Sequence, residues 1–158
     1  MPFKQQETQT YFHIAPIKVA VGTIIQPGNF GRIIRSHYPT NNTNNLVAPY
    51  REAVFEYARL ALAPSKPSRL DCLFACFTLA DAQAYRAANS PTGLIYEIEP
   101  NVGVGDAHIA DWQLISFPTT GQFSDIFEMA RQYWTGGNPA QNREILLPRA
   151  AKVVAFHG

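Results

Sequence analysis

The chain has 158 residues, of which 46% are hydrophobic and 16% charged, and its formal net charge is +1. This length and composition predict a single domain, 1–158, with a real hydrophobic core, and they exclude an intrinsically disordered chain. The small net charge argues against wholesale binding of polyanions but allows a local basic patch.

The N-terminal residues 1–10 are polar, so we expect a flexible end rather than a secretory signal. No apolar run approaches the roughly 18 residues of a membrane span, so we expect no membrane partner. Cys72 and Cys76 lie on one expected strand, too far apart for a disulfide. They indicate buried thiols in a reducing, cytoplasmic compartment, and no Cys or His spacing predicts a metal site.

Strands are predicted over 11–15, which Pro16 ends, and over 19–25, which a turn at 26–29 ends. The asparagine-rich stretch 36–49 predicts an exposed loop. Pro49 suits the first turn of a helix that ends before Pro64. Helical spacing gives this helix an inner face of Ala53, Val54, Tyr57, Leu60 and Ala61.

The apolar run 70–77 predicts a buried strand, after which Thr78 caps a helix that reaches about Ala88. Residues 94–99 alternate as a strand does, and 108–114 predict a short strand or turn.

Ser124 is a candidate cap for a third helix, and 152–156 form a last strand. The inner face of that helix is expected to comprise Ile126, Met129, Ala130 and Tyr133. The absence of a regular strand–helix alternation favours an α+β domain with a mainly antiparallel sheet and about three helices.

Turn formers at 136–139 lead into a short strand that carries Glu144. On a strand, Glu144 and Leu146 share one face, and Ile145 and Leu147 share the other. The carboxylate has two interpretations: a solvated strand end, or an acid placed at a cleft. His108 and Asp111 form either a functional pair or a structural hydrogen bond, and Trp112, Tyr133 and Trp134 are expected in the core or lining a cleft.

Phosphate-binding loops, dinucleotide-binding glycine motifs and nucleophile elbows are absent from the sequence. Four segments taken together, 11–14, 68–76, 94–100 and 142–148, resemble the ADP-ribosyltransferase superfamily. The third segment and the Gly-Asn-Pro at 137–139 are similar to rifampin ADP-ribosyltransferases, and the fourth is similar to DNA-modifying toxins of the DarT type. The resemblance implies a split, mainly antiparallel sheet and NAD as a substrate.

The resemblance also assigns roles to residues. Glu144 would be the catalytic acid and His13 would hold the ribose of NAD. Asp106 stands where rifampin transferases carry their catalytic aspartate, so the acidic role stays open between Glu144 and Asp106. Phe74, which replaces a tyrosine of many relatives, and Tyr85 would flank the nicotinamide. Arg32 or Arg69 would bind the pyrophosphate.

The expected activity is therefore mono-ADP-ribosyl transfer of a toxin-like or defence-like kind. The resemblance favours a nucleic acid as acceptor, followed by a protein and then a small molecule, and it allows a neutralising partner protein. Two alternatives stay open: an NAD glycohydrolase, with water as acceptor, and a non-catalytic NAD-binding module.

Overall fold

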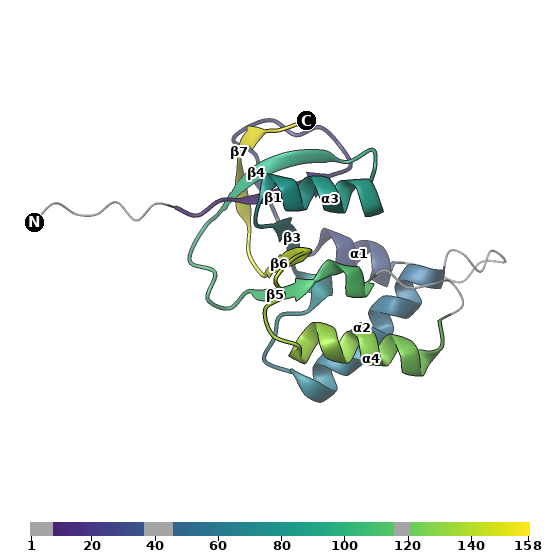
Figure 1. The fold of residues 1–158 in the computed structure, drawn as a ribbon. Helices are drawn as coiled ribbons and strands as arrows, with labels where there is room; N and C mark the ends of the chain where they lie inside the picture. Colours follow the sequence, from purple (N-terminus) through teal and green to yellow (C-terminus); the bar gives the residue numbers. More distant parts are fainter. Residues whose placement is uncertain (1–7, 37–45, 116–120) are drawn as a thin grey trace, which may run out of the picture.

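A computed structural model describes residues 8–36, 46–115 and 121–158. They form an α+β domain built on one seven-stranded antiparallel sheet, in the order β2-β7-β4-β1-β3-β6-β5 (Figure 1). The expected fold class is confirmed, and the described ranges contain four α-helices, one more than expected.

Strands and helices follow one another along the chain without regular alternation, and the paired strands are all antiparallel. The strands are β1 (Tyr11–Ala15), β2 (Ile24–Ile25), β3 (Leu73–Cys76), β4 (Leu94–Pro100), β5 (His108–Asp111), β6 (Arg143–Leu147) and β7 (Ala151–Phe156). The helices are α1 (Asn29–Arg35), α2 (Val47–Leu62), α3 (Leu79–Asn89) and α4 (Phe123–Thr135), with 3-10 turns η2 (Arg69–Asp71) and η3 (Trp112–Ile115).

The sheet is weakly joined in its middle. Five register pairs join β1 to β4, whereas the single pair Phe12–Cys76 joins β1 to β3. Cys76 also lies opposite Glu144 on β6. The two halves of the sheet therefore separate beside the strand position that carries Glu144.

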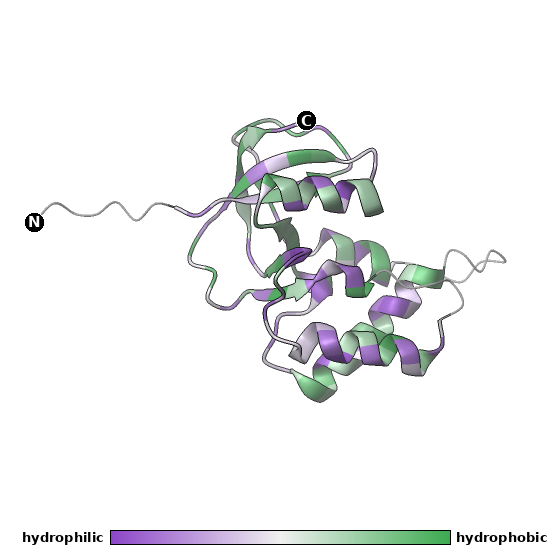
Figure 2. Ribbon diagram, viewed as in Figure 1, coloured by the Kyte–Doolittle hydropathy of each residue, from purple (hydrophilic) through white to green (hydrophobic). Residues whose placement is uncertain are grey.

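The two faces of β6 enter different cores. Leu146 packs with residues of α2 and α4, and Ile145 and Leu147 pack with β1, β4 and β7 on the other face. The predicted alternation along this strand is confirmed. Figure 2 shows both hydrophobic and hydrophilic bands along α2 and α4, as expected for helices with one face in a core.

Two strand predictions were too long. Only Ile24 and Ile25 of 19–25 form a strand, because Gly22 adopts a φ of +96° and turns the chain. Residues 69–71 form η2 instead of extending β3, since the Ser68 side chain accepts a hydrogen bond from the Leu70 amide. The stretch 108–114, predicted as a short strand or turn, contains both, since β5 is followed directly by η3.

The helix ends follow backbone geometry as well as capping side chains. Thr78 caps α3 by accepting from the Asp81 amide, as predicted. The prediction for Ser124 is wrong: α4 begins at Phe123 after Gln122, whose side chain makes no cap. The predicted inner face of α4 is confirmed, with Ile126, Ala130 and Tyr133 buried and Met129 packed against the core.

The predicted inner face of α2 is confirmed at Val54, which is buried, but the other predicted positions face away from the core. Tyr57 and Leu60 are 58% and 60% exposed, whereas Glu52, Phe55 and Ala58 are buried. Glu52 faces inward because a buried arginine binds it, and apolar periodicity alone does not register such a contact.

Helix α1 was not predicted, because Gly28, Asn29 and Gly31 favour turns. It packs against η2 so closely that Gly31 has no room for a side chain. The expected loop 36–49 is shorter, since α2 already begins at Val47, and its centre, 37–45, lies outside the described residues, as do 1–7 of the expected flexible N-terminus. In the described part of the chain, the helices are too short or too polar to span a bilayer.

A Gly31→Ala variant tests the packing of α1. An added Cβ would lie 1.8 Å from the Leu70 carbonyl oxygen, which belongs to the backbone and cannot rotate away. We expect a loss of about 1–3 kcal/mol in the free energy of unfolding by urea, although alanine favours a helix. Gly103→Ala, where a Cβ meets open space, is the control and should match wild type. Equal stabilities of the two variants would contradict the close packing.

Candidate functional site

A cavity of about 700 Å³ lies where β1 and β3 separate. Residues 12–15 of β1 and 73–76 of β3 line it consecutively, so the edges of both strands face it. Ile17 and Ile33, which are 67% and 51% exposed, also line the cavity, and it therefore opens to solvent at this side. Its volume falls in the usual range for small-molecule sites.

The cavity brings together most of the residues singled out from the sequence. Its lining includes His13, Arg69, Phe74, Tyr85 and Glu144. His13 and Glu144 thus share one cavity although they lie about 130 positions apart in the chain.

Glu144 is 2% exposed, so it is not a solvated strand end. Its strand begins directly after Asn142, whose φ of 55° is a left-handed conformation that asparagine tolerates. The Oε1 atom accepts hydrogen bonds from Arg69 Nη1 at 2.7 Å and from the Tyr133 hydroxyl at 2.6 Å. The carboxylate is therefore held from one side and lines the cavity on another.

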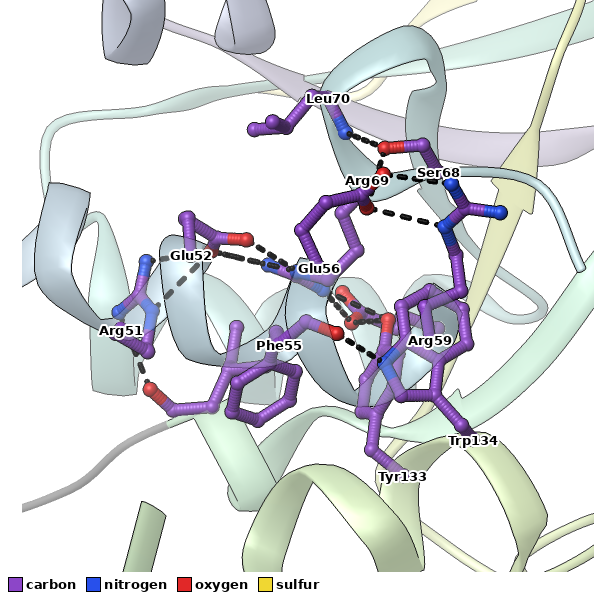
Figure 3. A network of polar contacts seen from close by, with 12 residues as sticks. Arg51, Glu52, Phe55, Glu56, Arg59, Ser68, Arg69, Leu70, Tyr133 and Trp134 are labelled. Atoms are coloured by element: carbon purple, nitrogen blue, oxygen red, sulfur yellow. Dashed lines mark hydrogen bonds and ion pairs between the residues drawn. The ribbon is translucent and has the colours of Figure 1, made fainter. Parts of the chain in front are cut away.

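Arg69 is 3% exposed and lies between two carboxylates, Glu52 and Glu144. Figure 3 shows the polar network to which Arg69, Glu52 and Tyr133 belong. The Nε atom of Arg69 is 3.0 Å from Glu52 Oε2, and its Nη1 binds Glu144. Burial opposes the charge on Arg69, but Glu52, Tyr133 and Glu144 raise the pKa of the guanidinium well above its usual value. Arg69 is thus a permanent cation that is already paired, not a surface arginine.

Arg51 and Glu52 extend this cluster. Arg51 donates to Glu52 Oε1 through Nε and Nη2, and to the Ile115 carbonyl through Nη1. Arg51 also lines the cavity. Sequence reasoning missed both residues, since charges within a helix usually face solvent. The i, i+3 spacing of Glu52 and Phe55, both buried, was the available signal.

Phe74 supports the cluster from the side of β3. Its ring lies 4.9 Å from the Arg69 guanidinium, and Phe30 meets it edge-on at 5.3 Å. The ring therefore already has a cationic partner. Phe30, on the unpredicted helix α1, also lines the cavity.

The imidazole of His13 bridges the separation between the strands. Its Nδ1 lies 2.7 Å from the Phe74 carbonyl oxygen. A carbonyl only accepts, so Nδ1 carries the proton and Nε2 of the neutral ring is an acceptor. Burial lowers the pKa of His13, and the bond to Phe74 only partly opposes this shift. The ring is therefore neutral at pH 7.

Three other lining side chains are protonated at neutral pH. Burial raises the pKa of the Cys72 thiol, of the Cys76 thiol and of the Tyr85 phenol to about 12. Cys72 and Cys76 are buried and free, as expected. Within the described ranges, no group of three or more His, Cys, Asp or Glu residues is placed to hold a metal ion.

Arg32 and Asp106 are not among the lining residues. Arg32 is exposed and donates through Nε and Nη2 to Asn29 Oδ1, whose residue does line the cavity. Asp106 forms an ion pair with Arg149 outside the cavity. Glu144, and not Asp106, therefore lines the same cavity as His13.

His108 and Asp111 do not pair. His108 is buried and its Nε2 contacts the Tyr133 carbonyl at 2.9 Å, whereas Asp111 accepts from the Gln113 amide. Residues three apart on a strand point to opposite faces, which explains the separation. Trp112, Tyr133 and Trp134 are core residues, as expected.

The lowered pKa of His13 predicts a pH dependence of stability. In the unfolded chain the His13 ring has a pKa near 6.5, whereas in the folded protein its pKa is lower. Below about pH 6.5 the unfolded state therefore binds more protons than the folded state, and the free energy of unfolding falls as the pH drops. His13→Asn should flatten this fall, measured by urea unfolding between pH 7.5 and 5.5. His108→Asn should act in the same sense, because burial also lowers the pKa of His108. An unchanged slope in both variants would show that the buried rings do not titrate as inferred.

Comparison with known proteins gives one family. A search of curated proteins finds no match. The model of a family described as "Protein of unknown function (DUF2441)" matches residues 6–156, nearly the whole chain. The chain therefore belongs to the DUF2441 family.

Proposed function

We propose that this protein is an NAD-dependent mono-ADP-ribosyltransferase that releases nicotinamide and transfers ADP-ribose to a macromolecule. The observation that carries the proposal is the convergence of His13 and Glu144 on one solvent-open cavity at the separation of β1 and β3. The resemblance to ADP-ribosyltransferases assigns ribose binding to His13 and catalysis to Glu144. His13 and Glu144 come from opposite ends of the sequence, so they would share a cavity by chance only rarely. Their convergence therefore supports the proposal.

The chemistry requires a carboxylate near the ribose. When the bond from ribose C1 to the nicotinamide nitrogen breaks, its electron pair neutralises the pyridinium and positive charge develops on the sugar, as in glycoside cleavage. A carboxylate bonded to a neighbouring ribose hydroxyl stabilises that charge most in the transition state. Among the described residues that line the cavity, Glu144 is the only one with a carboxylate, and we assign this role to it.

His13 orients the sugar. With Nδ1 donating to Phe74, its Nε2 accepts a hydrogen bond from a ribose hydroxyl. This contact fixes the ribose without adding charge to the site, since the ring is neutral. Tyr85 and Phe30 flank the nicotinamide, because Phe74 is engaged by Arg69.

The pyrophosphate requires a cation at the rim. Arg51 and Arg69 are both bound to Glu52, so neither is free to bind it. Arg32 makes no ion pair with the described residues and its partner Asn29 lines the cavity. Arg32 therefore binds the pyrophosphate at the cavity mouth.

Labelled NAD tests the reaction. The protein is incubated with adenine-labelled NAD and a cell extract, followed by nuclease or protease, and free nicotinamide is measured. We expect nicotinamide release and a labelled macromolecule, with nuclease sensitivity for a nucleic acid acceptor and protease sensitivity for a protein.

Glu144→Gln keeps the shape of the side chain and should slow release at least about 100-fold, since it removes the stabilising charge. Glu128→Gln, on the exposed face of α4, is the control and should leave release unchanged. Release without labelling would indicate a glycohydrolase, and NAD binding without release a binding module. Wild-type release that persists in Glu144→Gln would refute the catalytic assignment.

Arg32→Ala tests the pyrophosphate contact. We expect the KM for NAD to rise about tenfold with little change in kcat, because the lost contact forms equally in the ground and transition states. Nicotinamide riboside has no pyrophosphate, so its kcat/KM should be the same in Arg32→Ala and wild type. A similar loss for both substrates would place the effect of Arg32 elsewhere.

A further inference from the structure

Among the described residues, Glu144 is anchored through one of its carboxylate oxygens only. Both hydrogen bonds to its carboxylate reach Oε1, from Arg69 at 2.7 Å and from Tyr133 at 2.6 Å. No side chain or amide in the described ranges donates to Oε2. Such an arrangement fixes the plane of the carboxylate and leaves one oxygen for a donor on the ligand.

The two donors are themselves fixed. Arg69 donates to both oxygens of Glu52, from Nε at 3.0 Å and from Nη2 at 3.1 Å, so its planar fork cannot rotate. The rings of Phe74, Tyr133 and Phe55 surround the guanidinium at 4.9, 5.1 and 5.9 Å.

The neutral hydroxyl of Tyr133 links Arg69 to Glu144 by hydrogen bonds. This hydroxyl accepts from Arg69 Nη1 at 2.7 Å and donates to Glu144 Oε1. Burial raises the pKa of Tyr133 well above its usual value, and this keeps the proton on the hydroxyl. Its ring packs against Phe55 of α2 and against Trp134, so α4 sets its position.

The cluster balances its own charge. Two arginines, Arg51 and Arg69, face two carboxylates, Glu52 and Glu144, in a group with a formal charge of zero, of which Arg51 is half-buried and the other three are buried. Glu52 supplies the second partner of Arg69, so the Arg69 guanidinium is not left half-paired in the core. Glu52 on α2 therefore fixes Arg69, and Arg69 in turn fixes Glu144.

We propose that Arg69 and Tyr133 are positioning residues that hold Oε1 of Glu144 and present Oε2 to the ribose of the substrate. Arg69 therefore acts on the reaction through Glu144 and not through the pyrophosphate. The kinetic part of this inference rests on the proposed function, whereas the orientation of the carboxylate is a property of the protein alone.

Tyr133→Phe removes the hydroxyl and keeps the ring. We expect kcat for nicotinamide release to fall at least about tenfold, with the KM for NAD within about twofold of wild type, because the acid is misplaced and the binding contacts remain. Trp134→Phe is the matched control. Phenylalanine keeps an aromatic ring against Tyr133 but loses the buried Nε1 bond to the Phe55 carbonyl at the same α2–α4 interface, at 2.9 Å, without touching Glu144.

The control separates positioning from stability. Both variants should lower the Tm, but Trp134→Phe should retain wild-type kcat per folded molecule. Equal losses of kcat in the two variants, or an unchanged kcat in Tyr133→Phe, would overturn the proposal.

Crystal structures of wild type and Tyr133→Phe give a second measurement that is independent of NAD. We expect the Glu144 carboxylate in one orientation in wild type, and rotated or in several orientations in Tyr133→Phe. An unchanged, singly oriented carboxylate in the variant would overturn the positioning role even if wild type releases no nicotinamide. Absence of release together with a displaced carboxylate would instead refute the NAD reaction and leave the positioning intact.

Discussion

The buried guanidinium of Arg69 joins the helices to the sheet. One side of it binds Glu52 on α2, and the other binds Glu144 on β6. A buried ion pair contributes little net stability compared with apolar residues of the same volume, but removal of one partner is costly because the other charge stays unpaired. The cluster is therefore better explained by the geometry it imposes than by the stability it adds. It fixes where the helical layer lies relative to the strand that carries the acid.

The weak join in the sheet creates the space beside that acid. Beyond the pair Phe12–Cys76, β1 and β3 separate, and the cavity occupies the gap. An intact sheet would fill this position with interstrand hydrogen bonds. Here the imidazole of His13 crosses the gap to the Phe74 carbonyl and satisfies one of the exposed acceptors. The same break that opens the site also fixes the tautomer of its histidine.

Much of this arrangement follows from sequence pattern, and the rest depends on contacts between distant residues. The alternation around Glu144 and the cap at Thr78 are local properties, and both were predicted correctly. The inner face of α2 was not, because Arg69, seventeen positions along the chain from Glu52, turns a carboxylate inward. Helix α1 was missed because a glycine in the sequence usually indicates a turn. Gly31 instead allows the helix to pack closely against the backbone of Leu70. The assignment of NAD as substrate and of a macromolecule as acceptor rests on the resemblance to ADP-ribosyltransferases. The description of the matched family names no function.

The protonation states in the cavity narrow the chemistry that its residues support. Burial raises the pKa of Cys72, of Cys76 and of Tyr85 to about 12, so none of the three supplies an anionic nucleophile at neutral pH. Arg51 and Arg69 are committed to carboxylates, and His13 is neutral with one acceptor nitrogen directed by its partner. An oriented carboxylate and a neutral hydrogen-bond acceptor suit a sugar hydroxyl network better than they suit covalent catalysis by the protein. The proposed bond cleavage develops positive charge on the substrate, and a carboxylate placed in this way would stabilise such a charge.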